Sequence, residues 1–181
     1  MINAWRDLSP GKHPPELVSA VVEIPAGSRN KYELDKESGL IKLDRVLYSA
    51  VHYPGDYGFI PRSLHLDGDP CDVLVLINEP TFPGCLIDVR PIGVLKMLDR
   101  GEPDDKVLCV PANDPFYGEY FDIADIPQHY LKEVEHFFHI YKDLEGRRVQ
   151  TVGWEKSEAA LRVVSESIDR YRERYLARSG P

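Results

Sequence analysis

The pattern of apolar and polar positions changes character about two thirds of the way along the chain. Before residue 127 the apolar residues fall in short runs of strand-like composition, separated by proline and glycine turns. These runs cover residues 17–24, 31–34, 40–43, 73–77, 87–94 and 106–110. Several short strands with turns between them predict a closed antiparallel β-barrel and argue against alternating β-α-β units.

From Pro127 onward the apolar positions recur every three or four residues, which is typical of helices that pack on one face. Pro127 suits the first turn of one helix and Gly146 suits its end, while a second helix begins near Ser157. The apolar stripe of the first helix consists of Leu131, Val134, Phe138 and Tyr141, and that of the second consists of Leu161, Val164, Ile168, Tyr171 and Tyr175. A barrel followed by two main helices in the C-terminal third predicts an α+β fold.

Length and composition predict one domain. The 181 residues contain no internal repeat, low-complexity tract or long flexible linker, so we expect a single domain over residues 1–181. Its core would cover about 18–155, with a C-terminal helical extension of about 156–181.

The chain carries 22 Lys and Arg residues against 30 Asp and Glu, a net charge of −8. This balance argues against partners held mainly by a basic surface, such as nucleic acid or an anionic membrane.

Signals for membrane insertion or secretion are missing from the sequence. The longest unbroken aliphatic run spans residues 73–77, whereas a membrane helix needs about 20 apolar residues. The N-terminus lacks the basic and apolar segments of a secretory signal. The three cysteines, Cys71, Cys85 and Cys109, form no Cys-x-x-Cys pair. We therefore expect a cytoplasmic protein with reduced thiols and no membrane partner.

Three carboxylates fall within six residues in the segment Asp67-Gly68-Asp69-Pro70-Cys71-Asp72. Two like charges about 4 Å apart repel by roughly 4 kcal/mol at an effective dielectric constant near 20, and a divalent cation is the usual way to offset this repulsion. The alternative is an exposed polar turn whose carboxylates point apart. An EF-hand does not fit, because Asp72 stands where its glycine belongs and Asn78 where its glutamate belongs. Hard oxygen ligands without that spacing favour Mg²⁺.

Further charged residues lie near the ends of the predicted strands. The additional acids are Glu23, Glu33, Asp99 and Asp104, each of which would be solvent-exposed unless the fold brings them together. The cations that stand beside apolar or aromatic residues, and not in a basic block, are Lys31, Arg45, Lys106 and Lys142. Such cations stabilise the charge that builds on phosphate oxygens during phosphoryl transfer. Tyr53 and Tyr57 either donate hydrogen bonds to an oxyanion or belong to the core.

Other metal and nucleotide motifs are absent or weak. His136 and His139 favour a packing role, because neither a third ligand nor a His-Glu-x-x-His motif accompanies them. The sequence also lacks the glycine-rich phosphate loops of nucleotide-binding proteins and the Gly-x-Ser-x-Gly element of serine hydrolases.

Seven blocks of the sequence occur in a familiar order and spacing over about residues 18–155. They are Glu23-Ile24-Pro25, Lys31-Tyr32-Glu33, Asp44-Arg45, Tyr53-Pro54 with Tyr57-Gly58, residues 67–73, Val94-Leu95-Lys96-Met97, and His139-x-Tyr141-Lys142-Asp143-Leu144-Glu145. Together they resemble the soluble family I inorganic pyrophosphatases. The resemblance implies an OB-like β-barrel flanked by helices, in agreement with the order of barrel and helices predicted above.

The resemblance also implies a role for each matched residue. Asp67, Asp72 and Asp104 match metal ligands, with Asp72 bridging two ions, and Asp99 joins Asp104 at ions that arrive with the substrate. Asp69 matches the general base. Glu23 and Glu33 match further acids of the cavity, of which Glu33 is expected near both metal and substrate. The residues that match phosphate-contacting groups are Lys31, Arg45, Tyr57, Lys106, Tyr141 and Lys142, with Tyr53 lining the same pocket; Lys31, Arg45 and Tyr57 are expected to act in catalysis.

Three positions depart from the family pattern or leave it open. Cys71 stands where the family usually has a branched aliphatic residue, which places a thiol beside the acidic turn. Arg100 stands where some bacterial members have an acid. Asp104 and Asp105 form a doublet; the distances along the chain to Asp99 and Lys106 favour Asp104, but the local sequence leaves Asp105 open.

The function implied by the resemblance is hydrolysis of inorganic pyrophosphate to two orthophosphates. Several Mg²⁺ ions per site, replaceable by Mn²⁺, would activate a water for direct in-line attack without a covalent intermediate. The resemblance further implies a homo-oligomer, a hexamer as in bacterial relatives. An alternative is an OB-type module that stacks single-stranded nucleic acid on Tyr53, Tyr57 and Phe59, but the excess of acids argues against it. A two-carboxylate glycosidase is disfavoured by the number of acids and cations.

Overall fold

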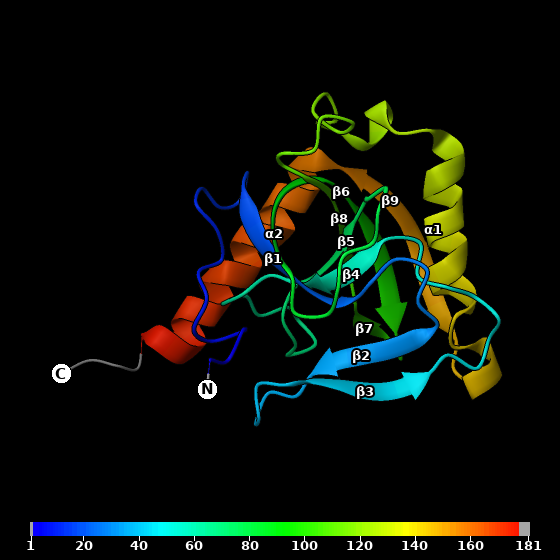
Figure 1. The fold of residues 1–181 in the computed structure, drawn as a ribbon, viewed down its shortest axis with the longest axis horizontal. Coiled ribbons are helices and arrows are strands. Elements are labelled where there is room, and N and C mark those ends of the chain that lie inside the picture. The colour runs from blue at the N-terminus through cyan, green and yellow to red at the C-terminus, as the bar shows by residue number, and fades with distance from the viewer. Residues whose placement is uncertain (1, 178–181) are drawn as a thin grey trace.

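A five-stranded closed barrel forms the centre of the computed structural model, which describes residues 2–177 (Figure 1). The strands lie in the order β1 (Val18–Ile24), β4 (Asp56–Phe59), β5 (Asp72–Val75), β8 (Lys106–Pro111) and β6 (Leu86–Asp99). Pairing of β6 with β1 closes the ring. The predicted α+β fold with an OB-like barrel is confirmed.

One pairing in the barrel is parallel, whereas the sequence pattern suggested antiparallel neighbours throughout. Strands β5 and β8 run in the same direction, with Val73 opposite Val107. The residues that begin these strands, Asp72 and Lys106, therefore lie next to each other at one end of the barrel. The parallel pair thus brings an acid and a cation together at a barrel end.

Two further strands extend the barrel sheet, and a separate two-stranded sheet lies beside it. Beyond the ring, β6 continues to pair with β9 (Val149–Lys156) and with the short β7 (Glu102–Pro103). Strands β2 (Asn30–Leu34) and β3 (Ile41–Val46) form a separate hairpin, which lies beneath the barrel in Figure 1. The sequence pattern did not predict β4, β7 or β9, because each is too short or too polar to show an apolar run.

Two helices cover the barrel, as predicted. Helix α1 (Gln128–Ile140) begins after Pro127 and buries Leu131, Val134, Phe137 and Phe138. It ends before Gly146, the predicted terminus. Gly146 instead adopts a φ of 70° and ends a short 3₁₀ turn, η2 (Asp143–Glu145).

The second helix, α2 (Ser157–Tyr171), buries a face shifted from the predicted stripe. Its buried residues are Ala159, Ala160, Val163, Val164, Ser167, Ile168 and Tyr171. Leu161 is only half-buried, and Tyr175 is 39% exposed. Tyr175 leaves the buried face because residues Arg172–Leu176 form a π-helical turn, η3, in which the α-helical period no longer applies.

The core consists of separate apolar clusters around the barrel wall. One joins the barrel to α1 and contains Phe138 and Ile92; another joins it to α2 and contains Val94 and Val164. A third cluster surrounds Trp5 near the N-terminus.

The expected C-terminal extension, 156–181, includes α2 and η3, while residues 178–181 lie outside the described residues. Within residues 2–177 no helix has the length and apolar character needed to span a bilayer.

Candidate active site

A cavity of about 710 Å³ opens at the barrel end where β5 and β8 begin. Its walls come from the β2–β3 hairpin, the segment before β5, the end of β6, the start of β8 and the segment after α1. Twelve of the fourteen predicted site residues line it: Glu23, Lys31, Glu33, Tyr57, Asp67, Asp69, Asp72, Asp99, Asp104, Lys106, Tyr141 and Lys142. The fold therefore brings together acids and cations that are far apart in the sequence.

The acidic turn forms one wall of the cavity. Gly68 has a φ of 89°, which a residue with a side chain rarely adopts, and this lets the chain reverse between two acids. The backbone N–H of Asp69 donates to Asp67 Oδ1 over 3.0 Å. Burial raises the pKa of Asp67, and the nearby Asp72 and Asp69 carboxylates raise it further. Asp69, by contrast, is 61% exposed at the rim and forms an ion pair with Lys36.

Lys106 lies at the floor of the cavity between two acids. Its Nζ lies 2.5 Å from Asp72 Oδ2 and also donates to Asp104. Burial alone would lower the pKa of Lys106, but the Asp72 and Asp104 carboxylates raise it well above its ordinary value. Burial would likewise raise the pKa of Asp104, but the Lys106 ammonium outweighs burial and the pKa of Asp104 is lowered. Lys106 and Asp104 therefore each favour the charged form of the other.

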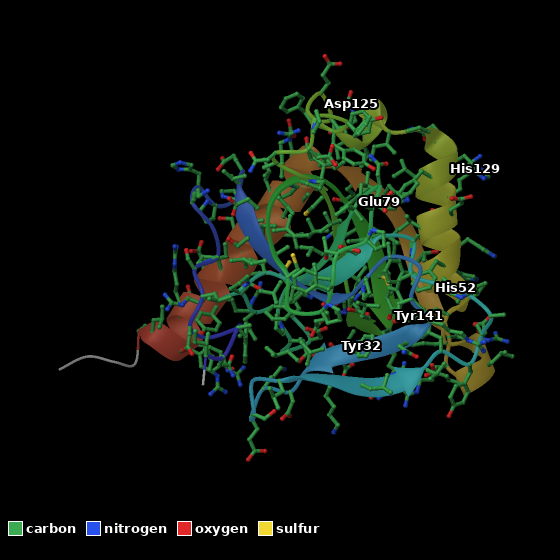
Figure 2. All side chains as sticks on the ribbon, viewed as in Figure 1. Tyr32, His52, Glu79, Asp125, His129 and Tyr141 are labelled. Carbon is green, nitrogen blue, oxygen red and sulfur yellow. The ribbon has the colours of Figure 1, made fainter. Side chains whose placement is uncertain are left out.

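A second pair joins the end of β6 to the segment after α1. Lys142 Nζ donates to Asp99 Oδ2 over 2.8 Å. The other oxygen, Asp99 Oδ1, is buried without a hydrogen-bond partner among the described residues. Tyr141 lines the cavity beside this pair, and burial raises the pKa of its hydroxyl. Tyr32 of the hairpin lines the same cavity, and both tyrosines are labelled in Figure 2.

The hairpin supplies Lys31 and Glu33, which lie two residues apart on β2 and so share one face. Lys31 forms an ion pair with Glu33 and lies 3.5 Å from Asp44 Oδ2 on β3. Glu23, at the end of β1, is buried and accepts a 2.6 Å hydrogen bond from the N–H of Leu34. Burial raises the pKa of Glu23 to about 8.

Two predicted site residues, Arg45 and Tyr53, do not line the cavity. Arg45 Nε donates to Glu145 Oε1 over 2.9 Å, and its Nη1 bonds Asp44. Its Nη2 is buried without a partner among the described residues. The Tyr53 ring lies 5.4 Å from the Tyr57 ring, so that Tyr53 supports the cavity wall from behind. Burial raises the pKa of both tyrosine hydroxyls well above the ordinary value.

The acid doublet separates into two environments. Asp104 lines the cavity, whereas Asp105 Oδ2 accepts a 2.6 Å hydrogen bond from Lys96 and lies 3.5 Å from His65 Nε2. The geometry thus agrees with the assignment of Asp104 to the site. The doublet lies in the short connection between β7 and β8, outside any strand, so the sequence pattern could not show which of the two side chains lines the cavity.

Sequence reasoning missed several residues that line the cavity. They are Tyr32, Asp35, Lys36, Glu37, Lys42, Asp44 and Glu102. Alternation along β2 and β3 could have suggested the strand residues among them, but Lys36 lies in the turn that joins these strands and its direction follows from tertiary contacts. His136 and His139 line no part of this cavity.

The cavity has the right ligand chemistry for a divalent cation, although no site is fully formed. Within residues 2–177 no three carboxylate, imidazole or thiol groups converge tightly enough to hold a metal ion as they stand. The Lys106 ammonium instead forms ion pairs with Asp72 and Asp104. The Lys142 ammonium forms an ion pair with Asp99. The unpartnered Asp99 Oδ1 and the surrounding carboxylates are hard oxygen donors, which fit Mg²⁺. Ion binding would require small rotations of these side chains.

Comparisons with known proteins identify the family. A model of the inorganic pyrophosphatase family matches residues 20–172. The chain belongs to this family. An inorganic pyrophosphatase of Geobacillus stearothermophilus is 54% identical over 158 residues, 87% of this chain and 96% of the relative. One of Haloferax volcanii is 50% identical over 176 residues, 97% of this chain and 99% of the relative.

Solved structures agree with this membership. The crystal structure of an inorganic pyrophosphatase from Thermus thermophilus matches with a TM-score of 0.91 and 46% identity, covering 94% of this chain and 99% of that one. The resemblance drawn from the sequence and the expected enzyme class, inorganic diphosphatase, are therefore confirmed.

Proposed function

We propose that this inorganic pyrophosphatase hydrolyses pyrophosphate to two orthophosphates by direct attack of water, with Mg²⁺ as its cofactor. The observation that carries the proposal is that seven predicted acidic residues converge with Lys31, Lys106 and Lys142 on one cavity in a member of this family. The acidic residues are Glu23, Glu33, Asp67, Asp69, Asp72, Asp99 and Asp104. A cavity rich in acids repels a polyanion unless cations offset the charge. Acids and ammonium groups together suit a substrate that arrives with divalent ions.

The carboxylates that would hold Mg²⁺ are Asp67, Asp72, Asp99 and Asp104, with Glu23 and Glu33 as further acids nearby. Bound there, Mg²⁺ would offset the negative charge of cavity and substrate and lower the pKa of a water molecule. Mn²⁺ offers similar coordination and is proposed as a substitute.

The protein's own residues would then position the reactants. Asp69, exposed at the rim, is the proposed acceptor of the proton of the attacking water. Lys31, Lys106 and Lys142 would neutralise the phosphate oxygens, on which charge accumulates as the bridging P–O bond breaks.

Three further residues complete the proposed phosphate site. The hydroxyls of Tyr57 and Tyr141, whose pKa values are raised, would stay protonated and donate hydrogen bonds. Arg45 would reach the substrate only by leaving Glu145, and its unpartnered Nη2 favours such a movement. Tyr53 would act by holding the Tyr57 ring in place.

Phosphate release in the presence and absence of metal tests the cofactor. Purified protein should convert one pyrophosphate into two phosphates with Mg²⁺, and chelation should abolish release until Mg²⁺ is restored. Equal release with and without chelator would contradict the proposal.

Isotope incorporation tests direct attack. In ¹⁸O-water a single turnover should place one ¹⁸O atom in one of the two product phosphates, and no phosphorylated protein should be trapped by rapid acid quenching. A trapped phosphoprotein would contradict direct attack.

The remaining proposals concern assembly and location. We propose a homo-oligomer, a hexamer by analogy with bacterial relatives, that works in the cytoplasm and binds neither nucleic acid nor membranes. Light scattering coupled to gel filtration measures the assembly, and a monomer at micromolar concentration would contradict it. Burial of Tyr53 and Tyr57 supports the exclusion of nucleic-acid stacking.

A further inference from the structure

The N-terminal segment, residues 2–17, reaches the rim of the cavity, although the family match begins only at residue 20. Trp5 anchors this segment: it is 2% exposed, and its Nε1 donates to the carbonyl oxygen of Ser63 over 2.8 Å. Its ring contacts Tyr171 and Tyr175 edge-on, at centroid distances of 5.6 and 5.7 Å. A tryptophan buried in this way fixes the segment that carries it.

The same segment holds the turn between β2 and β3. Asn3 Nδ2 donates to the carbonyl oxygen of Lys36 over 3.0 Å. The backbone of residues 2 and 3 passes so close to Gly39 that a side chain there would lie 3.2 Å from the carbonyl oxygen of Ile2. In Figure 1 the start of the chain, in dark blue, lies beside this turn.

Lys36 extends from that turn into the cavity rim. Its Nζ lies 5.2 Å from the centre of the Trp5 ring, within the range of a cation–π contact. The ammonium also forms an ion pair with Asp69 and lines the cavity, with 40% of the side chain exposed. An ammonium has three donors, so that Lys36 can hold Asp69 and a phosphate oxygen at once.

We propose that Lys36 is a further substrate-contacting residue, whose ammonium Trp5 and Asn3 hold at the cavity rim to capture the pyrophosphate–metal complex. The inference rests on the proposed hydrolysis of pyrophosphate in this cavity. The Lys36 side chain is more exposed than those of Lys31, Lys106 and Lys142. It pairs with Asp69, the most exposed carboxylate of the acidic turn. Its contribution should therefore fall on substrate capture, and the chemical step should depend on the buried Lys106.

Steady-state kinetics with saturating Mg²⁺ test the role of Lys36. Lys36→Met should raise the KM for pyrophosphate about three- to tenfold and leave kcat within about twofold. Lys36→Arg should restore most of the KM, because it keeps the charge and the cation–π contact. The matched control is Lys12→Met, which removes a charge from the same segment where Lys12 pairs with Asp88 of β6 outside the cavity. This control should leave KM unchanged.

A double-mutant cycle tests whether Trp5 acts through Lys36. Trp5→Phe keeps an aromatic ring in the cluster but weakens the cation–π contact, and it should raise KM about twofold in the wild-type background. In the Lys36→Met background the same change should leave KM unaltered. Thermal unfolding of each variant checks that the fold is kept, and the Lys36 variants test the proposal even if Trp5→Phe unfolds.

The outcomes separate this inference from the proposed function. Wild-type protein that releases no phosphate with Mg²⁺ would contradict the proposed function itself. Active wild-type protein with unchanged KM in Lys36→Met, an equal KM rise in Lys12→Met, or a loss of kcat alone would overturn the role of Lys36. Independent effects of the Trp5 and Lys36 changes would overturn the positioning by Trp5.

Discussion

Lys106 Nζ lies 2.5 Å from Asp72 Oδ2 because the two residues begin neighbouring parallel strands. The same ammonium donates to Asp104, so that one buried cation offsets two acids expected to bind metal. Metal ions and Lys106 thus compete for the same oxygens. Binding of Mg²⁺ would free the ammonium to turn towards the phosphate, which couples cofactor binding to substrate binding.

Replacement of Lys106 by Met should separate metal binding from turnover. Without the ammonium, Asp72 and Asp104 lose a competitor for Mg²⁺, so that the affinity for Mg²⁺, measured by calorimetry, should stay equal or increase. Activity should fall by about 100- to 1000-fold, because a preorganised charge at the leaving phosphate is lost. Lys96→Met is the control, since Lys96 pairs with Asp105 outside the cavity. Loss of Mg²⁺ affinity in Lys106→Met would contradict this competition.

The doublet offers a matched pair of substitutions. Asp104→Asn should weaken Mg²⁺ binding at least about tenfold and lower activity by about 100-fold, because a charged oxygen ligand is replaced by a neutral amide. Asp105→Asn should keep activity within about threefold but lower the free energy of unfolding by about 1–3 kcal/mol, because Lys96 loses its charged partner. Phosphate-release assays and denaturant unfolding check both. The reverse order of effects would assign the site to Asp105.

Glu23 should make the stability of the metal-free protein depend on pH. Burial raises its pKa from 4.5 to about 8 in the folded state, so that the folded protein keeps a proton that the unfolded chain releases. The free energy of unfolding should therefore decrease through this group as the pH rises from about 4.5 to about 8. In Glu23→Gln, which stays neutral, this decrease should be absent. Denaturant unfolding of metal-free protein at several pH values measures it, and parallel curves for both proteins would contradict it.

The sequence was most informative where the signal was local. Apolar periodicity separated the strands from the helices, and the acidic turn placed Asp67, Asp69 and Asp72 in one segment. The sequence could not show that Asp99 pairs with Lys142, because the two residues are 43 positions apart in the chain. The parallel pairing of β5 and β8 also leaves no local pattern, since either direction suits a short buried strand.

The family resemblance predicted the other site residues, and two of these, Arg45 and Tyr53, do not line the cavity. Arg45 turns towards Glu145, 100 residues away in the chain, and Tyr53 lies behind Tyr57. Both directions depend on side-chain packing, which strand alternation alone does not determine. Lys36 was not predicted for the same reason, because its ammonium lies near the Trp5 ring and Asp69 through tertiary contacts alone.

The thiols should be inert wherever the fold buries them. Cys71 and Cys109 are fully buried, and burial raises the pKa of Cys71 to about 12 and that of Cys109 well above its ordinary value. Only Cys85 is partly exposed. An aromatic disulfide reagent should therefore titrate one thiol per native chain and three in denaturant, and Cys71→Val should keep activity within about twofold. Rapid modification of a second thiol with loss of activity would show that the turn next to Asp72 opens in solution.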